Sequence, residues 1–116
     1  MHELGVVFYV IRDVKKIAEE NQVSSVASVT LRIGEVSGIL HDYLTDCWDW
    51  AKKKEPLLEE TELFIESIEA VTHCDGCGRD YETVKYGKTC PHCGSGATWL
   101  VTGNEFLIKE IAVPET

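Results

Sequence analysis

The sequence has no long apolar run and no cluster of basic residues. No segment approaches the roughly 18 consecutive apolar residues that a membrane-spanning helix requires. The chain contains 11 Lys and Arg against 20 Asp and Glu, which gives a formal net charge of −9. Such a surface repels a polyanion, whereas nucleic-acid binding normally needs a clustered basic face. The composition therefore argues against a membrane protein and against a nucleic-acid-binding protein.

The start of the chain also lacks the features of an export signal. The segment MHELGVVFYVIRDVKK has an apolar stretch, but Glu3 stands near its beginning, and it has no basic n-region and no small-residue cleavage site. We therefore expect a cytoplasmic protein whose thiols stay reduced. Paired cysteines in that compartment indicate metal or redox chemistry more often than structural disulfides.

The apolar pattern predicts two helices and three strands. With 44% hydrophobic residues among 116, the chain can build a modest core. The helices are expected at 4–20 and 41–54, where apolar residues recur at helical spacing. The strands are expected at 26–36, 61–71 and 105–113. The apolar stripe expected on the first helix consists of Leu4, Val7, Phe8, Ile11, Val14, Ile17 and Ala18.

These elements imply an α+β fold. We expect a small three-stranded sheet, antiparallel or mixed, with both helices packed on it. Residues 73–104 are rich in Gly and Cys and hold too few large apolar residues for a core of their own. We interpret 73–104 as an inserted, zinc-ribbon-like module with four cysteines, and residues 1–72 and 105–116 as one α/β domain. The strands on either side of the insertion are expected to pair antiparallel.

The second predicted helix carries a cysteine and two tryptophans. Its apolar stripe places Cys47 and Trp48 toward the core, so we expect Cys47 to be a buried, inert thiol. Trp48 and Trp50 cannot both face one core, because they are two residues apart on a helix. One of them is therefore expected to be exposed, and an exposed tryptophan often marks a partner surface.

Four of the five cysteines form a strong metal-binding pattern. The sequence gives Cys74-Asp-Gly-Cys77 and Cys90-Pro-His-Cys93, with 12 residues between the two pairs. A CxxC turn aims two thiolates at one ion, and two such turns complete a tetrahedral set of four sulfurs. Glycine follows each pair, which permits a positive φ and lets backbone N–H groups point at the sulfurs. We expect a structural zinc site, because zinc accepts a closed sulfur shell and has no redox demand.

Iron is the alternative metal for this module. CxxCG and CPxCG resemble rubredoxin knuckles, and Tyr81 and Tyr86 would be the nearby aromatic residues. The short gap between the pairs and the small number of aromatic residues favour zinc. His73 and His92 stand beside the thiolates, and we expect them to be exposed or to lie outside the ligand set.

The first three residues form a second candidate metal site. The α-amino group of Met1, the backbone nitrogen of His2 and its imidazole can close two small chelate rings on one ion, and Glu3 adds a carboxylate or its own backbone nitrogen. A nitrogen-rich, square-planar set suits Ni(II) or Cu(II). Taken alone, the residues do not decide the matter, since His-Glu after Met is common by chance and an acid suits the first turn of a helix.

Three features together resemble one known family. MHEL at the start, VTLRIGEVSG in the first strand and its turn, and the CxxC-x12-CxxC module resemble the HypA/HybF hydrogenase nickel-incorporation proteins. The resemblance covers essentially the whole chain, in order. It differs at Gly5, where many members have serine, and this change removes no expected ligand.

The resemblance implies a nickel metallochaperone that is not an enzyme. It implies His2 as the essential nickel ligand, with Glu3 as its neighbour in the nickel site or in partner docking. It also implies Cys74, Cys77, Cys90 and Cys93 as the zinc ligands. Members accept Ni(II) as cargo, work with a HypB-type GTPase and help to insert nickel into the large subunit of NiFe hydrogenase. Some members also serve urease maturation, and a homodimer is compatible with the family.

Two other functions and one further residue stay open at this stage. A zinc-ribbon protein-interaction module with an irrelevant N-terminus and a rubredoxin-like electron carrier both fit the cysteines. Asp42, at the start of the second predicted helix, is expected to cap that helix, although an acid there could also approach the N-terminus and complete the nickel shell.

Overall fold

The computed structural model describes residues 3–114, and the chain divides into two compact units. The first unit comprises Met1–Leu31, Ile39–Glu66 and Leu107–Thr116, and the second comprises Arg32–Gly38 and Ser67–Phe106. Among the described residues, no helix combines the length and the apolar character that crossing a bilayer would need.

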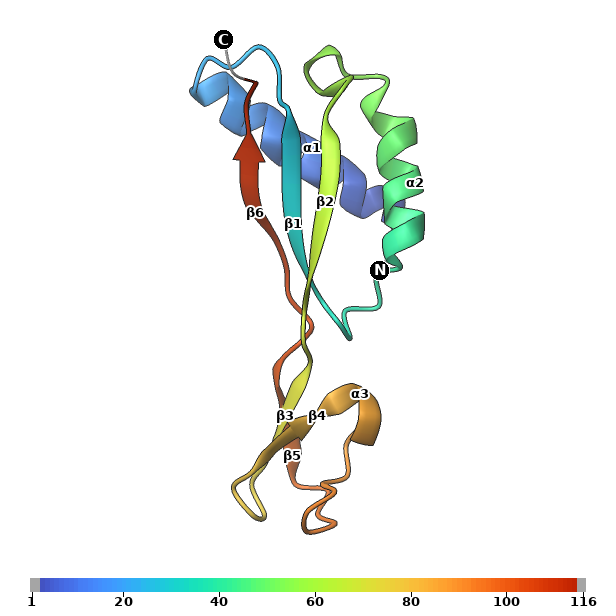
Figure 1. Ribbon diagram of the computed structural model, residues 1–116, viewed down its shortest axis with the longest axis vertical. Helices are drawn as coiled ribbons and strands as arrows, with labels where there is room; N and C mark the ends of the chain where they lie inside the picture. Colours follow the sequence, from blue (N-terminus) through green and yellow to red (C-terminus); the bar gives the residue numbers. More distant parts are fainter. Residues whose placement is uncertain (1–2, 115–116) are drawn as a thin grey trace. The chain divides into compact units, whose positions relative to one another are not determined.

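The first unit contains two helices and a three-stranded sheet (Figure 1). The helices are α1 (Glu3–Glu20) and α2 (His41–Lys52), and a short 3-10 turn follows at Pro56–Leu58. The strands lie in the order β2 (Glu62–Ile68), β1 (Ser28–Gly34), β6 (Phe106–Ala112). The predicted α+β class is confirmed, and each predicted element is present with its ends shifted by a few residues.

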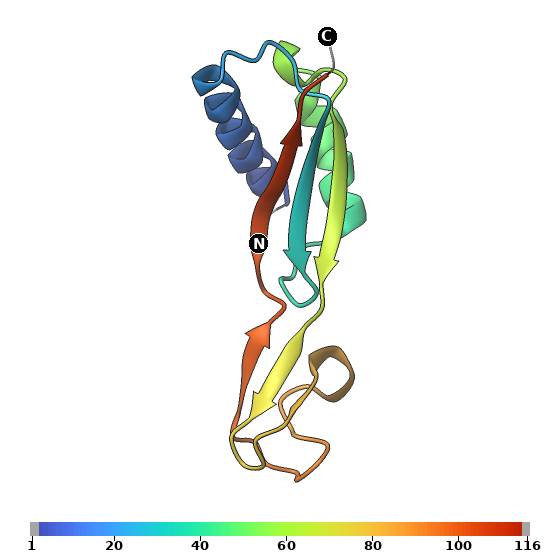
Figure 2. The same cartoon turned by 60° about the vertical axis from the view of Figure 1, so that its left-hand side comes forward.

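The sheet is mixed, with β1 at its centre. β1 and β2 run in the same direction and β6 runs opposite to them, as Figure 2 shows. The parallel pair follows from the connection through α2, because parallel neighbours need a crossover. The prediction that the two strands flanking the insertion pair with each other is wrong, since β1 lies between them.

The core lies where β1 and the two helices bury their apolar side chains. On β1, Val29, Leu31 and Ile33 are almost fully buried, as the alternating pattern predicts. On α1 the buried arc is wider than the predicted stripe, because Val6 and Val10 are also buried. The predicted members Phe8 and Ile17 are 48% and 40% exposed. The buried residues of α1 are Glu3, Val6, Val7, Val10, Ile11, Val14 and Ala18.

Helix α2 is fixed to the unit by Trp48. Its side chain is 1% exposed, and its indole Nε1 donates a hydrogen bond to the Thr61 carbonyl oxygen at 3.1 Å. Cys47 is buried as predicted, and Trp50 is the exposed tryptophan of the pair, with 51% of its surface accessible. The aromatic ring of Trp50 contacts Phe8 of α1 edge-on, with the ring centroids 6.5 Å apart.

The second unit contains three short strands that the sequence pattern did not indicate. β3 (Val71–Cys74) lies between β4 (Asp80–Glu82) and β5 (Thr98–Thr102), and it is antiparallel to both. A single helical turn, α3 (Thr83–Tyr86), follows β4. The strands are too short for an alternating pattern to stand out among the glycines and cysteines.

Two glycines of the second unit allow close approach of its backbone segments. A Cβ atom on Gly34 would lie 2.0 Å from the carbonyl oxygen of Gly103, and Gly103 itself has φ +124°. The backbone nitrogen of Val36 donates to that same oxygen at 2.8 Å. A side chain at position 34 would therefore force rigid backbone groups apart.

Gly34→Ala is expected to lower the free energy of unfolding by about 2–4 kcal/mol, because the backbone must move to admit the methyl group. Gly96→Ala is the matched control, since a Cβ there meets nothing within 4 Å. Urea unfolding of the two variants and of the parent protein measures both effects. Equal stability of the two variants would show that the close approach of these segments costs nothing to relieve.

Candidate metal centres

The four paired cysteines come together at one end of the second unit. Cys74 ends β3, and Cys77 lies in the turn between β3 and β4. Cys90 and Cys93 lie in the loop between α3 and β5. The four Sγ atoms all lie within 4.8 Å of one another, and no other group of three or more His, Cys, Asp or Glu side chains among residues 3–114 could hold a metal ion.

The sulfur arrangement fits a tetrahedral ion. The Sγ atoms of Cys74 and Cys93 are 3.5 Å apart, and those of Cys77 and Cys90 are 3.7 Å apart. Sulfurs placed tetrahedrally about 2.3 Å from a zinc ion are roughly 3.8 Å from one another. All five cysteines are free of disulfides, so the four sulfurs are available as thiolates. The cluster can therefore hold a zinc ion without rearrangement of its backbone.

The two cysteine turns have matching backbone geometry. Gly78 and Gly94 both have φ +75°, a value that favours glycine. The nitrogen of Gly78 donates to the Cys74 carbonyl oxygen at 2.8 Å, and that of Gly94 donates to the Cys90 carbonyl oxygen at 2.9 Å. Each turn thus folds back on its first cysteine in the same way, which is what the predicted pair of metal knuckles requires.

The cluster packs against an aromatic side chain. Tyr81 is 7% exposed and forms one buried group with Cys74 and Cys90. Its hydroxyl donates to the Gly87 carbonyl oxygen at 2.8 Å, and its ring meets that of Tyr86 edge-on. Tyr81 therefore supplies the apolar support that the module lacks elsewhere. The sequence indicated an aromatic residue near the cysteines, but not that its ring is buried against them.

Backbone N–H groups and neighbouring sulfurs determine the pKa values of the thiols. Burial raises the pKa of Cys90, but hydrogen bonds from the backbone of Cys93 and His92, together with the other sulfurs, lower that pKa to about 7. The Ser95 backbone N–H lowers the pKa of Cys93, but the Cys74 sulfur, burial and the other sulfurs raise it to about 12. A metal ion must therefore displace protons from the cluster at neutral pH.

Zinc binding is expected to weaken on acidification, and more steeply below pH 7. Above pH 7, Cys90 has lost its proton while Cys93 keeps its own. Below pH 7, Cys90 takes up a proton that zinc must also displace, so the slope of log affinity against pH rises by about one. Titration against a competing chelator from pH 5 to 9 measures this slope. A slope that stays constant across pH 7 would contradict the low pKa of Cys90.

Of the two histidines beside the cluster, His73 contacts neighbouring side chains and His92 is exposed to solvent. The Nδ1 atom of His73 lies 2.6 Å from the Oδ1 atom of Asp80, and its ring lies 5.4 Å from that of Trp99. Its Nε2 atom lies 3.6 Å from a carboxylate oxygen of Asp75. His92 is exposed. Neither histidine joins the group of metal-ligating atoms, in line with the expectation for both.

Of the three residues predicted to bind nickel, only Glu3 is described. Met1 and His2 lie outside the described residues. Glu3 is 7% exposed, and its Oε2 atom accepts a hydrogen bond from the Leu40 backbone nitrogen at 3.0 Å. Leu40 is the N-cap residue of α2, immediately before His41. Glu3 therefore connects the start of α1 to the start of α2.

The prediction that Asp42 caps α2 is wrong. The N-cap residue is Leu40, whose own side chain forms no cap hydrogen bond. The Leu40 N–H is bound by the Glu3 carboxylate instead. Asp42 is exposed in the first turn of α2, where an acid suits the helix dipole. The Glu3–Leu40 contact brings His41 and Asp42 to the side of the first unit where α1 begins.

Glu3→Ala is expected to lower the free energy of unfolding by about 1–3 kcal/mol, because the part-buried N–H of Leu40 loses a charged acceptor. Glu3→Gln should cost less, since its amide oxygen can still accept that hydrogen bond. Glu19→Ala, an exposed change on the same helix, serves as the control. Urea unfolding compares the three variants, and an unaffected Glu3→Ala protein would rule out this structural role.

Comparisons with a family model and with curated relatives all match this chain to the same family. The family model described as "Hydrogenase/urease nickel incorporation, metallochaperone, hypA" matches residues 1–113. The Hydrogenase maturation factor HypA of Chlorobium phaeobacteroides is 34% identical over 113 residues, covering 97% of this chain and 99% of that protein. The factor of the same name from Geobacter metallireducens is 33% identical with the same coverage.

The fold also matches solved structures. The solution structure of the Ni metallochaperone HypA from Helicobacter pylori gives a TM-score of 0.71 at 22% sequence identity, covering 97% of both chains. A second solution structure of a HypA protein gives a TM-score of 0.73, covering 98% of this chain and 97% of the other. At this identity the likeness shows a shared fold.

Proposed function

Since the chain belongs to the HypA family of hydrogenase/urease nickel-incorporation metallochaperones, we propose that it binds Ni(II) at its N-terminus and delivers it for the maturation of NiFe hydrogenase. The observation that carries the proposal is the family match from residue 1, which includes the Met1-His2-Glu3 segment. Urease is the alternative recipient that the family description includes.

In the proposed nickel site, the α-amino group of Met1 and the backbone and ring nitrogens of His2 bind the ion. Nitrogen donors in a plane suit Ni(II). Glu3 contributes its backbone nitrogen or its carboxylate. If the Oε2 atom of Glu3 binds nickel, it does so in competition with the Leu40 N–H, from which it accepts a hydrogen bond at 3.0 Å. Protons compete for the same nitrogens, so the ion is exchangeable, and this suits a protein that must release its cargo.

The zinc site has a different proposed role. We assign Cys74, Cys77, Cys90 and Cys93 to one structural zinc ion, supported by the fit of the sulfur separations to a tetrahedral shell. Four protein ligands leave no open coordination position, so this ion holds the second unit together and performs no catalysis. The protein is thus a carrier of nickel and has no enzymatic activity of its own.

The proposed setting follows from the chemistry. Cysteine pairs that come together to hold a metal ion are typical of a reducing compartment, which supports a cytoplasmic location. A HypB-type GTPase and the large subunit of NiFe hydrogenase are the proposed partners, and a homodimer is compatible with the same role. The family's work in nickel incorporation requires contact with maturation partners, which the chain must recognise through its protein surface.

Complementation tests the proposal directly. In a nickel-limited host that lacks its own protein of this family, the untagged chain should restore nickel content and activity of the hydrogenase. The His2→Ala variant should fail to do so while it keeps its zinc. His92→Ala, an exposed histidine outside the ligand set, is the matched control and should restore activity. Full restoration by His2→Ala would exclude the proposed nickel ligand.

A further inference from the structure

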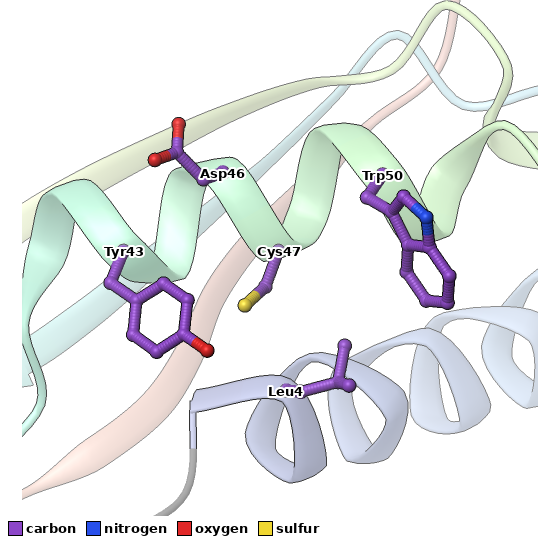
Figure 3. A pocket seen from close by; sticks show the side chains of 5 residues that line it. All are labelled: Leu4, Tyr43, Asp46, Cys47 and Trp50. Atoms are coloured by element: carbon purple, nitrogen blue, oxygen red, sulfur yellow. The ribbon is translucent and has the colours of Figure 1, made fainter.

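A groove between α1 and α2 is lined by none of the residues assigned above to zinc or to nickel. Its lining is Leu4 from α1 and Tyr43, Asp46, Cys47 and Trp50 from α2, around a pocket of about 250 Å³. Figure 3 shows Tyr43, Cys47 and Trp50 facing Leu4, with the Asp46 carboxylate at the rim pointing away from α1. The floor and walls of this groove are apolar. Its rim carries the Asp46 carboxylate, whereas the Lys54 ammonium lies 3.7 Å from the centroid of the Trp50 ring, so the negative charge is confined to the part of the groove near Asp46.

Large apolar side chains extend this groove along both helices. Leu40 is 65% exposed and Tyr43 is 48% exposed, and both line a second hollow together with Asp42 and Asp46. At the other end, Trp50 and Phe8 are about half exposed and contact each other. An apolar surface of this extent on two packed helices is typical of a site for another protein.

The negative charges of Asp42 and Asp46 beside the groove favour a partner with a positively charged surface. Asp42 and Asp46 are exposed, and neither forms an ion pair with any residue in the range 3–114. Asp49 differs, since its carboxylate lies 3.7 Å from the Lys52 ammonium. Two unpaired carboxylates beside an apolar floor attract a cationic group and repel an anionic one. The complementary surface is therefore apolar with Lys or Arg along one side.

We propose that this groove binds an amphipathic helix of a partner protein, with an apolar side chain inserted between Tyr43 and Trp50 and a Lys or Arg beside Asp42 and Asp46. A groove between two packed helices can bind a third helix, whose apolar residues at i, i+3, i+4 and i+7 face the groove. The exposed tryptophan supplies the large, rigid contact that dominates such interfaces. The inference goes beyond nickel binding and needs no metal at the N-terminus.

Synthetic helical peptides test this docking surface on the full-length, zinc-loaded protein. The probe is a peptide of about 14 residues with Leu at i, i+3, i+4 and i+7 positions and Lys elsewhere. One comparison peptide has Glu in place of each Lys, and another has the same composition with Leu spread around the helix. The Leu–Lys amphipathic peptide should bind in calorimetry, and each comparison peptide should bind at least about tenfold more weakly.

Variants locate the binding on the protein. Trp50→Ala should weaken binding of the Leu–Lys peptide by about tenfold or more, while Trp99→Ala, an equally exposed tryptophan of the second unit, should not. Asp46→Lys should weaken it more than Glu19→Lys, which makes the same charge change at the far end of α1. Circular dichroism checks that each variant is folded.

Several outcomes would overturn the proposal. If the amphipathic peptide and the peptide with Leu spread around the helix bind equally well, the charge of the peptide alone accounts for the binding. If Asp46→Lys and Glu19→Lys weaken binding equally, the net charge of the protein accounts for it and the groove does not. A concentration-dependent dimer of the wild type that Trp50→Ala abolishes would assign the groove to a second copy of this chain. Loss of binding in His2→Ala would instead tie the surface to the nickel segment.

Discussion

Cys90→Ser is expected to abolish zinc binding and to unfold the second unit. Cys90 is 1% exposed, and its sulfur lies 3.7 Å from that of Cys77, so it is one of the two buried members of the four-sulfur group. Zinc contributes on the order of 10 kcal/mol to the folding of a module of this kind. The remaining apolar support, centred on Tyr81, is too small to replace it. A chelator applied to the wild type should have the same effect.

Metal analysis and amide NMR measure this outcome. We expect no bound zinc and a loss of signal dispersion for β3, β4 and β5, with the helical signal of the first unit largely retained. Cys47→Ser is the control, because Cys47 is buried in α2 and lies outside the four-sulfur group. It should keep one zinc ion per chain. A Cys90→Ser protein that retained one zinc ion and a folded second unit would refute the structural role of the metal.

His2→Ala is expected to cause the second large effect, a loss of nickel affinity of about a thousandfold, equivalent to about 4 kcal/mol. The change removes the imidazole donor and one chelate ring, and the amine and amide nitrogens that remain hold the ion weakly. Nickel titration of untagged protein by calorimetry measures the loss. His41→Ala, a half-buried histidine at the start of α2, tests whether a neighbouring imidazole takes part.

The zinc content should be unchanged in both histidine variants, because neither residue belongs to the four-sulfur group. Wild-type nickel affinity should also rise with pH, since the amine and backbone nitrogens must lose protons to bind the ion. A His2→Ala protein with wild-type nickel affinity would leave the function supported by family membership alone.

Sequence patterns predicted most of the first unit, because its elements are long enough for periodicity to show. The alternation in β1 placed Val29, Leu31 and Ile33 in the core, and the stripe on α2 placed Cys47 and Trp48 there. Periodicity failed for the arc of α1, where Phe8 is exposed and Val10 is buried. A helix that packs against a sheet and a second helix buries more than one stripe, and this is a tertiary effect.

The four-cysteine cluster could be predicted in full, whereas its surroundings could not. Cysteine spacing specifies the ligands because a CxxC turn has few ways to present two sulfurs. The position of Tyr81 against the cluster depends on the register of β3 and β4, in which Thr72 pairs with Tyr81. The contact between Glu3 and Leu40 joins residues 37 positions apart, and no local pattern carries that information.

The groove between α1 and α2 could also not be predicted from local sequence patterns. An exposed tryptophan on the second helix was expected, but the pairing of Trp50 with Phe8 depends on how α1 and α2 pack together. The side of α2 that carries Asp42 and Asp46 could be read from the sequence, whereas the apolar floor beside them could not. Surface sites of this kind combine residues from separate elements, so they become visible only with the tertiary structure.

The central claim is that the first nitrogens of the chain and the His2 imidazole hold nickel together. The most direct test is nickel titration of the full-length, zinc-loaded protein before and after one residue is added ahead of Met1, which converts the amine into an amide. We predict one Ni(II) per chain in the native protein and a loss of at least about a hundredfold in affinity for the extended protein. Equal nickel binding by the two proteins would contradict the account.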